Sequence, residues 1–304
     1  MTDLLICFDA FGTLFYPKRS IAEQYGKVAR QHGLSGFTNH QIHENFRKAF
    51  KEEAKRHPNY GKDVGLAAPE WWGNIIKKTF KPFVQDAQFP PMLVPNLLRR
   101  FSSEEGYALY DDVLPFFEKL RKVREAKSKT DRAWPWRRTA VGIITNSDDR
   151  VPSILRSFGL VVGSRYDFNA QPAEDLPHRA ADIDFVTLSY DVGFEKPHKN
   201  IFSAAVDAAK VSTNDELDIG RLQRIYIGDD FEKDVVGALD SGWEGISLNR
   251  GDDHPDRGEQ RISRTRTMLP SQSGAPREVE FWSMPDLETL YSHMEGVRND
   301  RMTN

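Results

Sequence analysis

The chain has 304 residues, enough for one large or two modest domains with a substantial core, which excludes a small disulfide-stapled scaffold. With 42 lysines and arginines against 45 aspartates and glutamates, the formal net charge of −3 provides no overall field that would attract nucleic acid or a membrane surface, and neither is expected as a partner. The single cysteine, Cys7, excludes an intramolecular disulfide and, with no apolar signal segment at the N-terminus, predicts an intracellular, cytoplasmic location.

The first predicted element is a buried strand at residues 4–8, an apolar run that ends in a turn. Residues 20–104 then show helical patterns and no strand pattern. The helical patterns occupy residues 20–33, 40–56, 69–83 and 94–101. We therefore predict an all-helical cap domain at residues 17–111, inserted into a core that is made of residues 1–16 and 112–304.

Strand and helix patterns alternate from residue 111 onward. The strand patterns occupy residues 140–145, 184–189, 224–227, 245–248 and, more weakly, 279–282. The helical patterns occupy residues 111–122, 151–158, 200–209, 234–239 and 285–295. Such alternation is typical of a parallel sheet, because the crossover between two parallel strands usually contains a helix. We therefore predict an α/β fold with a doubly wound, Rossmann-like parallel sheet that carries helices on both faces.

Three segments are predicted as loops, at residues 126–138, 165–181 and 251–277. The first is basic and contains Trp134 and Trp136, a combination that also occurs on surfaces on which single-stranded nucleic acid stacks. Because the chain as a whole carries almost no net charge, we interpret this segment as a solvated insertion between a helix and a strand.

Polar and charged side chains follow four of the predicted strands at the points where these strands end. They are Asp9 and Thr13 after the first strand, Thr145 and Asn146 after the second, Lys196 after the third, and Asp229, Asp230 and Asp234 after the fourth. In an open parallel sheet, ligands bind at the carboxyl ends of the strands. We therefore expect these side chains to meet at one edge of the sheet.

This set of side chains suits phosphoryl transfer. A carboxylate such as Asp9 can attack phosphorus and form an aspartyl phosphate, which divides one difficult displacement into two easier ones. Mg²⁺ is the expected cofactor, held by Asp9 and Asp229, while Lys196 is expected to bind both the phosphate and Asp9. The hydroxyl of Thr145 and the amide of Asn146 are expected to donate to phosphoryl oxygens. The expected partner is a small phosphorylated molecule.

The motifs DAFGTLF, IITNS, GFEKP and IGDDFEKDVVGA, in this order, resemble the four motifs of the haloacid dehalogenase-like hydrolase superfamily. The resemblance covers nearly the whole chain, and the segments HPNYG and FEKPHKNIF are most similar to its REG-2-like branch. It implies a helical cap between the first two motifs, Asp9 as the nucleophile, Thr145 as the second-motif hydroxyl and Lys196 as the third-motif lysine. It further implies that Asp229 is a metal ligand and that Asp234 is the second acid of the fourth motif.

Phe11 departs from the phosphatases of this superfamily, which usually carry a second aspartate two residues after the nucleophile. That aspartate protonates the leaving alcohol and then activates water, and the loss of such a group costs roughly 10²- to 10⁴-fold in rate. We therefore expect slow cleavage of alkyl phosphates and less impaired cleavage of esters whose leaving group needs no proton. The backbone carbonyl of Phe11 can still bind Mg²⁺.

Two other functions stay open beside a phosphatase. The first is a 2-haloacid dehalogenase with Asp9 as nucleophile, since an aromatic residue also occurs at this position in those enzymes of the resembled superfamily, where halide leaves without a proton. They work without metal, however, and the acidic cluster that includes Asp229 requires a cation beside Asp9. The second is a catalytically impaired binding or interaction module on the same fold. The identity of the substrate and the oligomeric state do not follow from the sequence.

Thr13, Asp230 and Asp234 also have structural interpretations. The hydroxyl of Thr13 either binds phosphate or satisfies its own turn. One of the two acids is expected to support the metal and the other to cap the following helix, and we favour Asp234 as the residue at the metal.

Overall fold

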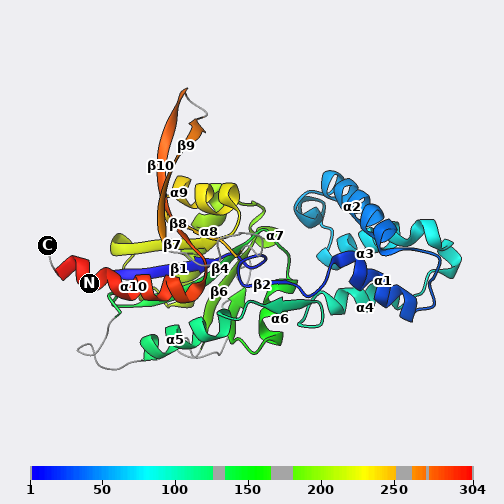
Figure 1. Cartoon of the computed structure of the whole chain (residues 1–304), viewed down its shortest axis with the longest axis horizontal. Helices are drawn as coiled ribbons and strands as arrows, with labels where there is room; N and C mark the ends of the chain where they lie inside the picture. The colour runs from blue at the N-terminus through cyan, green and yellow to red at the C-terminus, as the bar shows by residue number, and fades with distance from the viewer. Residues whose placement is uncertain (1, 126–133, 166–180, 251–261, 272–273, 303–304) are drawn as a thin grey trace.

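The centre of the molecule is an eight-stranded sheet in the order β5-β6-β4-β1-β7-β8-β10-β9 (Figure 1). Neighbouring strands are parallel except β9 and β10, which are antiparallel. The computed structural model describes residues 2–125, 134–165, 181–250, 262–271 and 274–302. The strands of the sheet are β1 (Asp3–Phe8), β4 (Thr139–Thr145), β5 (Val162–Arg165), β6 (Ile183–Leu188), β7 (Leu222–Gly228), β8 (Glu244–Leu248), β9 (Ser263–Ser271) and β10 (Gly274–Met284).

Helices cover both faces of this sheet, as the alternating pattern predicts. Along β1, Leu4 and Ile6 pack into one hydrophobic cluster and Leu5 and Cys7 into another, because successive side chains of a strand point to opposite faces. The first cluster contains residues of α5 (Val113–Glu125), α6 (Arg150–Ser157) and α10 (Leu287–Met302). The second contains residues of α8 (Lys199–Ser212) and α9 (Gly237–Asp240). Figure 1 shows these two groups below and above the sheet, which confirms the predicted fold class.

A helical insertion, which we define as residues 18–106, leaves and re-enters the sheet region through a short ribbon of β2 (Phe15–Pro17) and β3 (Tyr107–Leu109). Its helices are α1 (Ile21–Gln31), α2 (Asn39–Arg56), α3 (Ala68–Phe80) and α4 (Leu93–Arg100), with the short 3₁₀ helices η1 (Asn59–Val64), η2 (Lys81–Phe83) and η3 (Asp86–Gln88). Figure 1 shows the insertion beside the carboxyl edge of the sheet. The four predicted helices are all present, whereas strand β3 lies inside the segment that we predicted to be all-helical.

Strands at the edges of the sheet differ most from the prediction. The whole of β9 lies in the predicted loop at residues 251–277, and β10 is much longer than the weak strand pattern indicated. Strand β9 alternates Arg and Thr instead of forming an apolar run, and its arginines pair with Glu280 of β10. Strand β5 was not predicted either, because its sequence VGSR is polar and half exposed. Residues 166–180 and 251–261 of the predicted loops lie outside the described residues.

Trp134 and Trp136 are buried side chains of the core, with 4% and 2% of their surface exposed. Their indole N–H groups donate to Thr139 Oγ1 and Gln223 Oε1, each at 2.8 Å, and Trp134 stacks on Tyr291. The interpretation of this segment as a solvated insertion is therefore wrong for residues 134–136, and neither ring is free to stack on nucleic acid. Residues 126–133 lie outside the part of the chain that the structure describes.

The described helices include no segment long and apolar enough to cross a bilayer.

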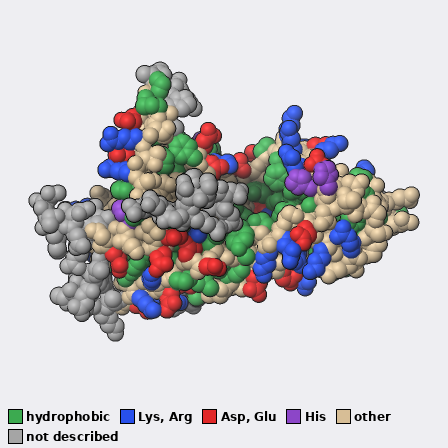
Figure 2. Space-filling view, viewed as in Figure 1, with side chains coloured by type: hydrophobic (Ala, Val, Ile, Leu, Met, Phe, Trp, Pro, Cys, Tyr) green, Lys and Arg blue, Asp and Glu red, His purple; other side chains and the backbone are tan. Residues whose placement is uncertain are grey.

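Hydrophobic side chains are visible in the hollow between the sheet and the insertion (Figure 2). Basic side chains gather on the insertion, over α1 and α4.

Candidate active site

The ends of β1 and β7 bring three acidic side chains together. Asp9 directly follows β1, Asp229 directly follows β7, and Asp234 lies in the turn of helix η5 (Phe231–Val236) that comes next. One carboxylate oxygen from each of these residues lies within 4.8 Å of the others. The edge of the sheet therefore concentrates three carboxylates, as the strand-end pattern predicted.

Lys196 supplies the positive charge in this acidic cluster, with only 1% of its side chain exposed. Its Nζ lies 3.0 Å from Asp9 Oδ1 and 2.7 Å from Asp234 Oδ1. It also donates to the hydroxyl of Tyr226 at 2.7 Å, which in turn donates to the carbonyl of Ile144. Burial lowers the pKa of Lys196, but the two carboxylates outweigh burial and raise it above its ordinary value. The ammonium is therefore charged and fixed in position.

Asp234 faces the cluster, while Asp230 does not. Asp234 Oδ1 accepts from Lys196, and its Oδ2 accepts from the backbone N–H of Asp230 at 2.9 Å. Burial raises the pKa of Asp234; Lys196 lowers it and Asp9 raises it, and the net shift is upward. The side chain of Asp230 instead accepts from the N–H of Lys233 and pairs with Lys233 Nζ at 2.6 Å. Asp230 thus caps η5, as one of the two acids was expected to do.

Asp229 is held by the turn that follows β1. Thr13 donates from Oγ1 to Asp229 Oδ1 at 3.0 Å, so its hydroxyl is used on a carboxylate rather than within its own turn. Partial burial raises the pKa of Asp229 above its ordinary value, although part of the side chain reaches solvent. The hydrogen bond from Thr13 lowers the pKa and offsets part of this rise. Gly12 has φ of +76°, and a Cβ built on it would lie 2.2 Å from Asp229 Oδ2. Only glycine therefore fits at position 12.

Gly12→Ala is expected to lower the free energy of unfolding by about 2 kcal/mol, because alanine strains the left-handed backbone and displaces Asp229. Gly33→Ala is the matched control: Gly33 has φ of +82°, but nothing lies within 4 Å of its added Cβ. Urea unfolding measures the strain that both variants share, and calorimetry with Mg²⁺ measures the effect on Asp229. Unchanged Mg²⁺ binding in Gly12→Ala would show that the contact with Asp229 does not shape a cation site.

The carboxamide of Asn146 holds the loop that carries Lys196. Its Nδ2 donates to the Lys196 carbonyl at 3.0 Å, and its Oδ1 accepts from the Lys196 N–H at 2.6 Å. One of its two N–H groups is thus used on the backbone of Lys196, and donation of the other to a phosphoryl oxygen stays a prediction. Thr145 ends β4 beside it, with 1% of its surface exposed.

The side chain of Phe11 packs against other aromatic rings and has no group that could transfer a proton. Its ring lies 4.6 Å from that of Phe15 and 5.5 Å from that of Tyr107, so it contributes to the aromatic packing around the β2–β3 ribbon. Phe15 bonds through its N–H to the Ala10 carbonyl and through its carbonyl to the Gly12 N–H. Neither of these two backbone hydrogen bonds uses the carbonyl of Phe11.

The donors in the cluster fit a hard divalent cation. Carboxylate and carbonyl oxygens are the ligands that Mg²⁺ prefers. Asp9 Oδ1 is buried, and its partner among the described residues is the ammonium of Lys196, 3.0 Å away. With three carboxylates and one ammonium, the cluster keeps an excess of negative charge that a divalent cation would balance.

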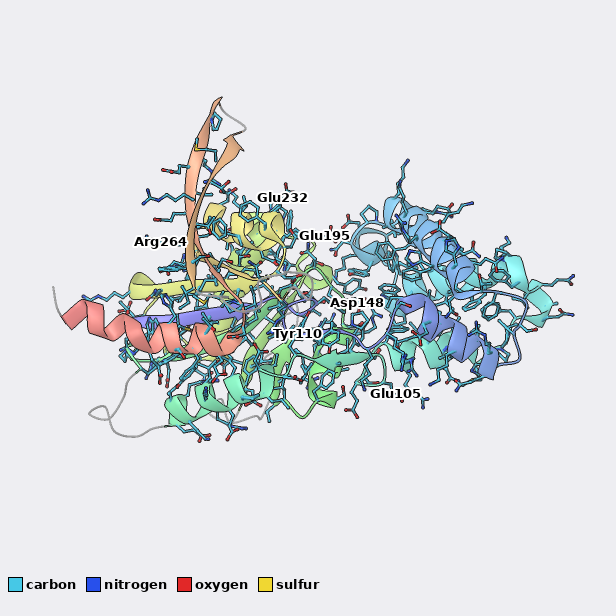
Figure 3. The ribbon with its side chains drawn as sticks, viewed as in Figure 1. Glu105, Tyr110, Asp148, Glu195, Glu232 and Arg264 are labelled. Carbon is cyan, nitrogen blue, oxygen red and sulfur yellow. The ribbon has the colours of Figure 1, made fainter. Side chains whose placement is uncertain are left out.

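A second polar cluster, absent from the sequence analysis, joins the sheet to the insertion beside this site. Asp148 is fully buried; it forms two hydrogen bonds with the guanidinium of Arg150, at 2.8 and 2.9 Å, and accepts one from Trp72 Nε1 at 2.7 Å. Figure 3 shows Asp148 between the sheet and the insertion. Nearby, Tyr60 of η1 donates to the carbonyl of Asn146 at 3.2 Å. The sequence signal for the pairing of Asp148 with Arg150 was the run NSDDR directly after β4.

Arg150→Met is expected to lower the free energy of unfolding by about 3 kcal/mol at neutral pH, because it leaves a buried carboxylate without its cation. Burial raises the pKa of Asp148, but Arg150 outweighs burial and lowers it. The pair therefore stabilises the protein above the ordinary aspartate pKa of about 3.9, and this contribution is lost as pH falls through the lowered value.

Urea unfolding between pH 7 and pH 3 checks this prediction, with the exposed Arg99→Met as the control. The gap between wild type and Arg150→Met is expected to narrow toward low pH, since a protonated Asp148 needs no cation. A gap that is constant over this range would mean that the lost packing of Arg150, rather than its charge, causes the effect.

Comparisons with known proteins find relatives of this chain in sequence and in fold. The sequence profile of the haloacid dehalogenase-like hydrolases matches residues 4–242. A Schizosaccharomyces pombe protein described as an uncharacterized hydrolase is 30% identical over 239 residues, which is 79% of this chain and 87% of that protein. Haloacid dehalogenase-like hydrolase domain-containing protein 3 of Danio rerio is 26% identical, over 88% of this chain and 95% of its own length. In structure, the chain resembles the magnesium-bound HAD-hydrolase YfnB of Bacillus subtilis, with a TM-score of 0.54, 15% identity and coverage of 97% and 99%.

Proposed function

Because the chain belongs to the haloacid dehalogenase-like hydrolase family, we propose that it is a Mg²⁺-dependent phosphatase of a small phosphorylated metabolite, with Asp9 as the nucleophile. One observation carries the proposal. A fixed ammonium, Lys196, lies 3.0 Å from a buried oxygen of Asp9, within a cluster of three carboxylates. Nucleophile, fixed cation and metal-binding oxygens are what phosphoryl transfer through a carboxylate needs.

In the first step, a carboxylate oxygen of Asp9 forms a bond to the phosphorus of the ester. The bond between phosphorus and the leaving oxygen breaks, and that oxygen keeps the electron pair. In the second step, water attacks the phosphorus of the aspartyl phosphate, the bond to Asp9 breaks, and inorganic phosphate is released. Lys196 neutralises negative charge on the transferring group and orients Asp9, while Asn146 fixes the loop that carries Lys196. The Thr145 hydroxyl, at the end of β4, is expected to donate to the phosphate.

Asp9, Asp229 and the Phe11 carbonyl would hold the Mg²⁺, which would supply positive charge for the transferring phosphoryl group. Asp234 completes the group of three carboxylates and would support the metal, while its oxygens also accept from Lys196 and from the Asp230 N–H. Thr13 orients Asp229. The positive charge of the ion would balance the negative charge of the carboxylates.

We also propose that residues 1–16 with 112–304 form the catalytic core, and that residues 17–111 form a cap domain over it. The two crossings of the chain at β2 and β3 and the position of α1 to α4 beside the sheet support this division. The contacts of Trp72 and Tyr60 with the loop after β4 support a position of the insertion beside the site. An intracellular location stays a prediction from cysteine usage.

An activity assay with two esters tests the proposal. Wild type with Mg²⁺ is expected to release phosphate from p-nitrophenyl phosphate and far more slowly from an alkyl phosphate, since Phe11 cannot protonate the alkoxide. EDTA is expected to stop both reactions. Absence of phosphate release from the activated aryl ester would refute the phosphatase.

The aromatic residue at position 11 keeps a dehalogenase as the second candidate, since halide leaves without a proton. Chloride release from 2-chloropropionate in the presence of EDTA would favour it over the phosphatase. Neither product, combined with ligand binding at Asp9, would instead indicate an impaired binding module.

A further inference from the structure

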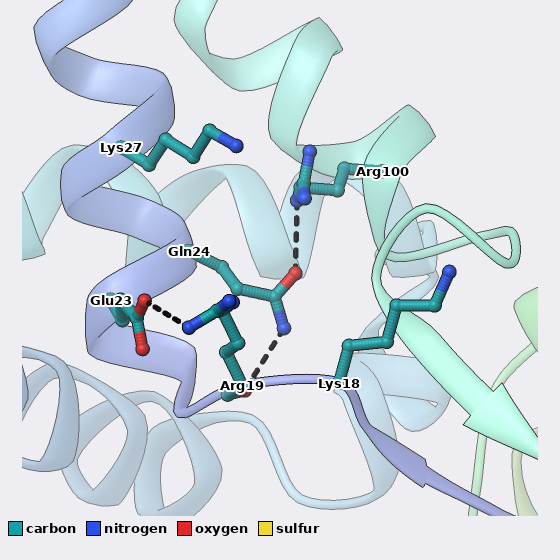
Figure 4. A pocket seen from close by; sticks show the side chains of 6 residues that line it. All are labelled: Lys18, Arg19, Glu23, Gln24, Lys27 and Arg100. Atoms are coloured by element: carbon teal, nitrogen blue, oxygen red, sulfur yellow. Dashed lines mark hydrogen bonds and ion pairs between the residues drawn. The ribbon is translucent and has the colours of Figure 1, made fainter.

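The helical insertion carries a basic pocket that is separate from the candidate active site (Figure 4). It has a volume of about 310 Å³ and is lined by Lys18, Arg19, Glu23, Gln24, Lys27 and Arg100, which we call the linker pocket. Lys18 and Arg19 belong to the segment that leads from β2 into α1, and Arg100 ends α4 shortly before the chain returns to β3. The pocket therefore lies where both chain crossings meet the insertion.

The charges in the linker pocket are unbalanced. Arg19 pairs with Glu23 at 3.1 Å, which uses the one carboxylate of the lining. No described residue forms an ion pair with the ammonium of Lys18 or of Lys27. Arg100 forms only a long ion pair, between its Nη1 and Glu105 Oε2 at 3.8 Å, with an acid that does not line the pocket. Figure 4 shows the ends of Lys27 and Arg100 directed toward each other beside Gln24, an arrangement that costs energy unless an anion separates them.

Gln24 makes this arrangement rigid. It is 2% exposed, and its Nε2 donates to the carbonyls of Arg19 and Gly106, both at 3.0 Å. Its Oε1 accepts from Nε of Arg100 at 2.9 Å, which fixes the guanidinium and leaves its other N–H groups for a ligand. Because Gln24 is tied to both chain crossings, the position of Arg100 is set by the fold and not by its own flexible side chain. A pre-oriented guanidinium loses little entropy when it binds an anion.

We propose that the linker pocket binds a diphosphate group, using Lys18, Lys27 and Arg100. The guanidinium fork matches the geometry of phosphate oxygens, and two ammonium groups add the point charges that a second phosphate needs. A volume of about 310 Å³ lies at the small end of ligand sites and accommodates a compact anion. The site uses no residue of the Asp9 cluster, so it does not depend on the proposed phosphatase activity.

Titration calorimetry on the full chain in EDTA tests this site, with inorganic pyrophosphate as the probe. Lys18→Ala and Lys27→Ala, both exposed and without a described ion-pair partner, are each expected to weaken binding about tenfold, and the double variant about a hundredfold. Lys48→Ala, an exposed lysine of α2 outside the pocket, is the matched control and should bind as wild type does.

Two further ligands identify the chemistry of the anion. ADP binding comparable to that of pyrophosphate would show that the pocket accepts a diphosphate carried by a nucleoside, whereas pyrophosphate binding alone would restrict it to the free anion. Citrate binding tighter than either would overturn the assignment to phosphate. The proposal is also overturned if wild type does not bind pyrophosphate, or if the two lysine variants bind it as tightly as Lys48→Ala.

Discussion

Phosphate release by Asp9→Asn is expected to fall by roughly 10⁴-fold or more, to the background of the assay, because the amide cannot form the acyl phosphate on which the reaction depends. The substitution is nearly isosteric, and Lys196 keeps Asp234 as a charged partner, so the fold is expected to survive. The measurement is release of inorganic phosphate from p-nitrophenyl phosphate with Mg²⁺, at equal amounts of folded protein.

Asp230→Asn is the matched control for this variant. Asp230 lies next to the cluster in sequence, but its carboxylate caps η5 and pairs with Lys233. It should keep the wild-type rate within a few-fold and most of the stability, because asparagine caps a helix about as well as aspartate. Equal activity of wild type and Asp9→Asn would remove Asp9 from the mechanism, and equal loss in both variants would show that the assay reports the local fold.

Lys196→Met is expected to damage both stability and rate. It leaves Asp9 and Asp234 without their shared cation, and the loss of one member of a buried charge cluster costs about 3 kcal/mol or more. The raised pKa of Lys196 means that the ion pairs stabilise the fold below the ordinary lysine pKa of about 10.4. This stabilisation is lost as pH rises through the raised value. The rate is expected to fall by at least about 10³-fold, since the charge on the phosphoryl group loses its fixed partner.

Urea unfolding at pH 7 and the phosphate assay check the two effects, and the exposed Lys233→Met is the control. Lys233 pairs with Asp230 on the surface, where an ion pair contributes about 0–1 kcal/mol. A Lys196→Met protein as stable and as active as Lys233→Met would contradict the role of a buried cation in the cluster.

The sequence predicts the centre of the sheet better than its edges. Strand β1 is buried on both faces and reads as a continuous apolar run, so its pattern is unambiguous. Strand β9 has no such run, because one of its edges is unpaired and its side chains pair with β10 through charges. Propensity and pattern do not encode that long-range pairing, and β9 was therefore mistaken for a loop.

Within the site, the sequence predicts which residues come together but not which atoms they bind. The rule that ligands sit at strand ends places Asp9, Lys196 and Asp229 at one edge. Asn146 was expected to face phosphate, and the fold also brings the Lys196 backbone, 50 residues away, to its carboxamide. The hydrogen bond between Trp72 and Asp148 joins residues 76 positions apart, and no local sequence pattern predicts it.

The most direct test of the central claim, a nucleophilic Asp9 beside a Mg²⁺ site, is thermal unfolding with Mg²⁺ and beryllofluoride. Beryllofluoride forms a stable adduct on an aspartate nucleophile without turnover. Slow turnover caused by Phe11 therefore does not hide the adduct. Wild type is expected to gain about 5 °C or more with both components and little with either alone, while Asp9→Asn gains nothing. No gain in wild type, or the same gain in Asp9→Asn, would contradict the account.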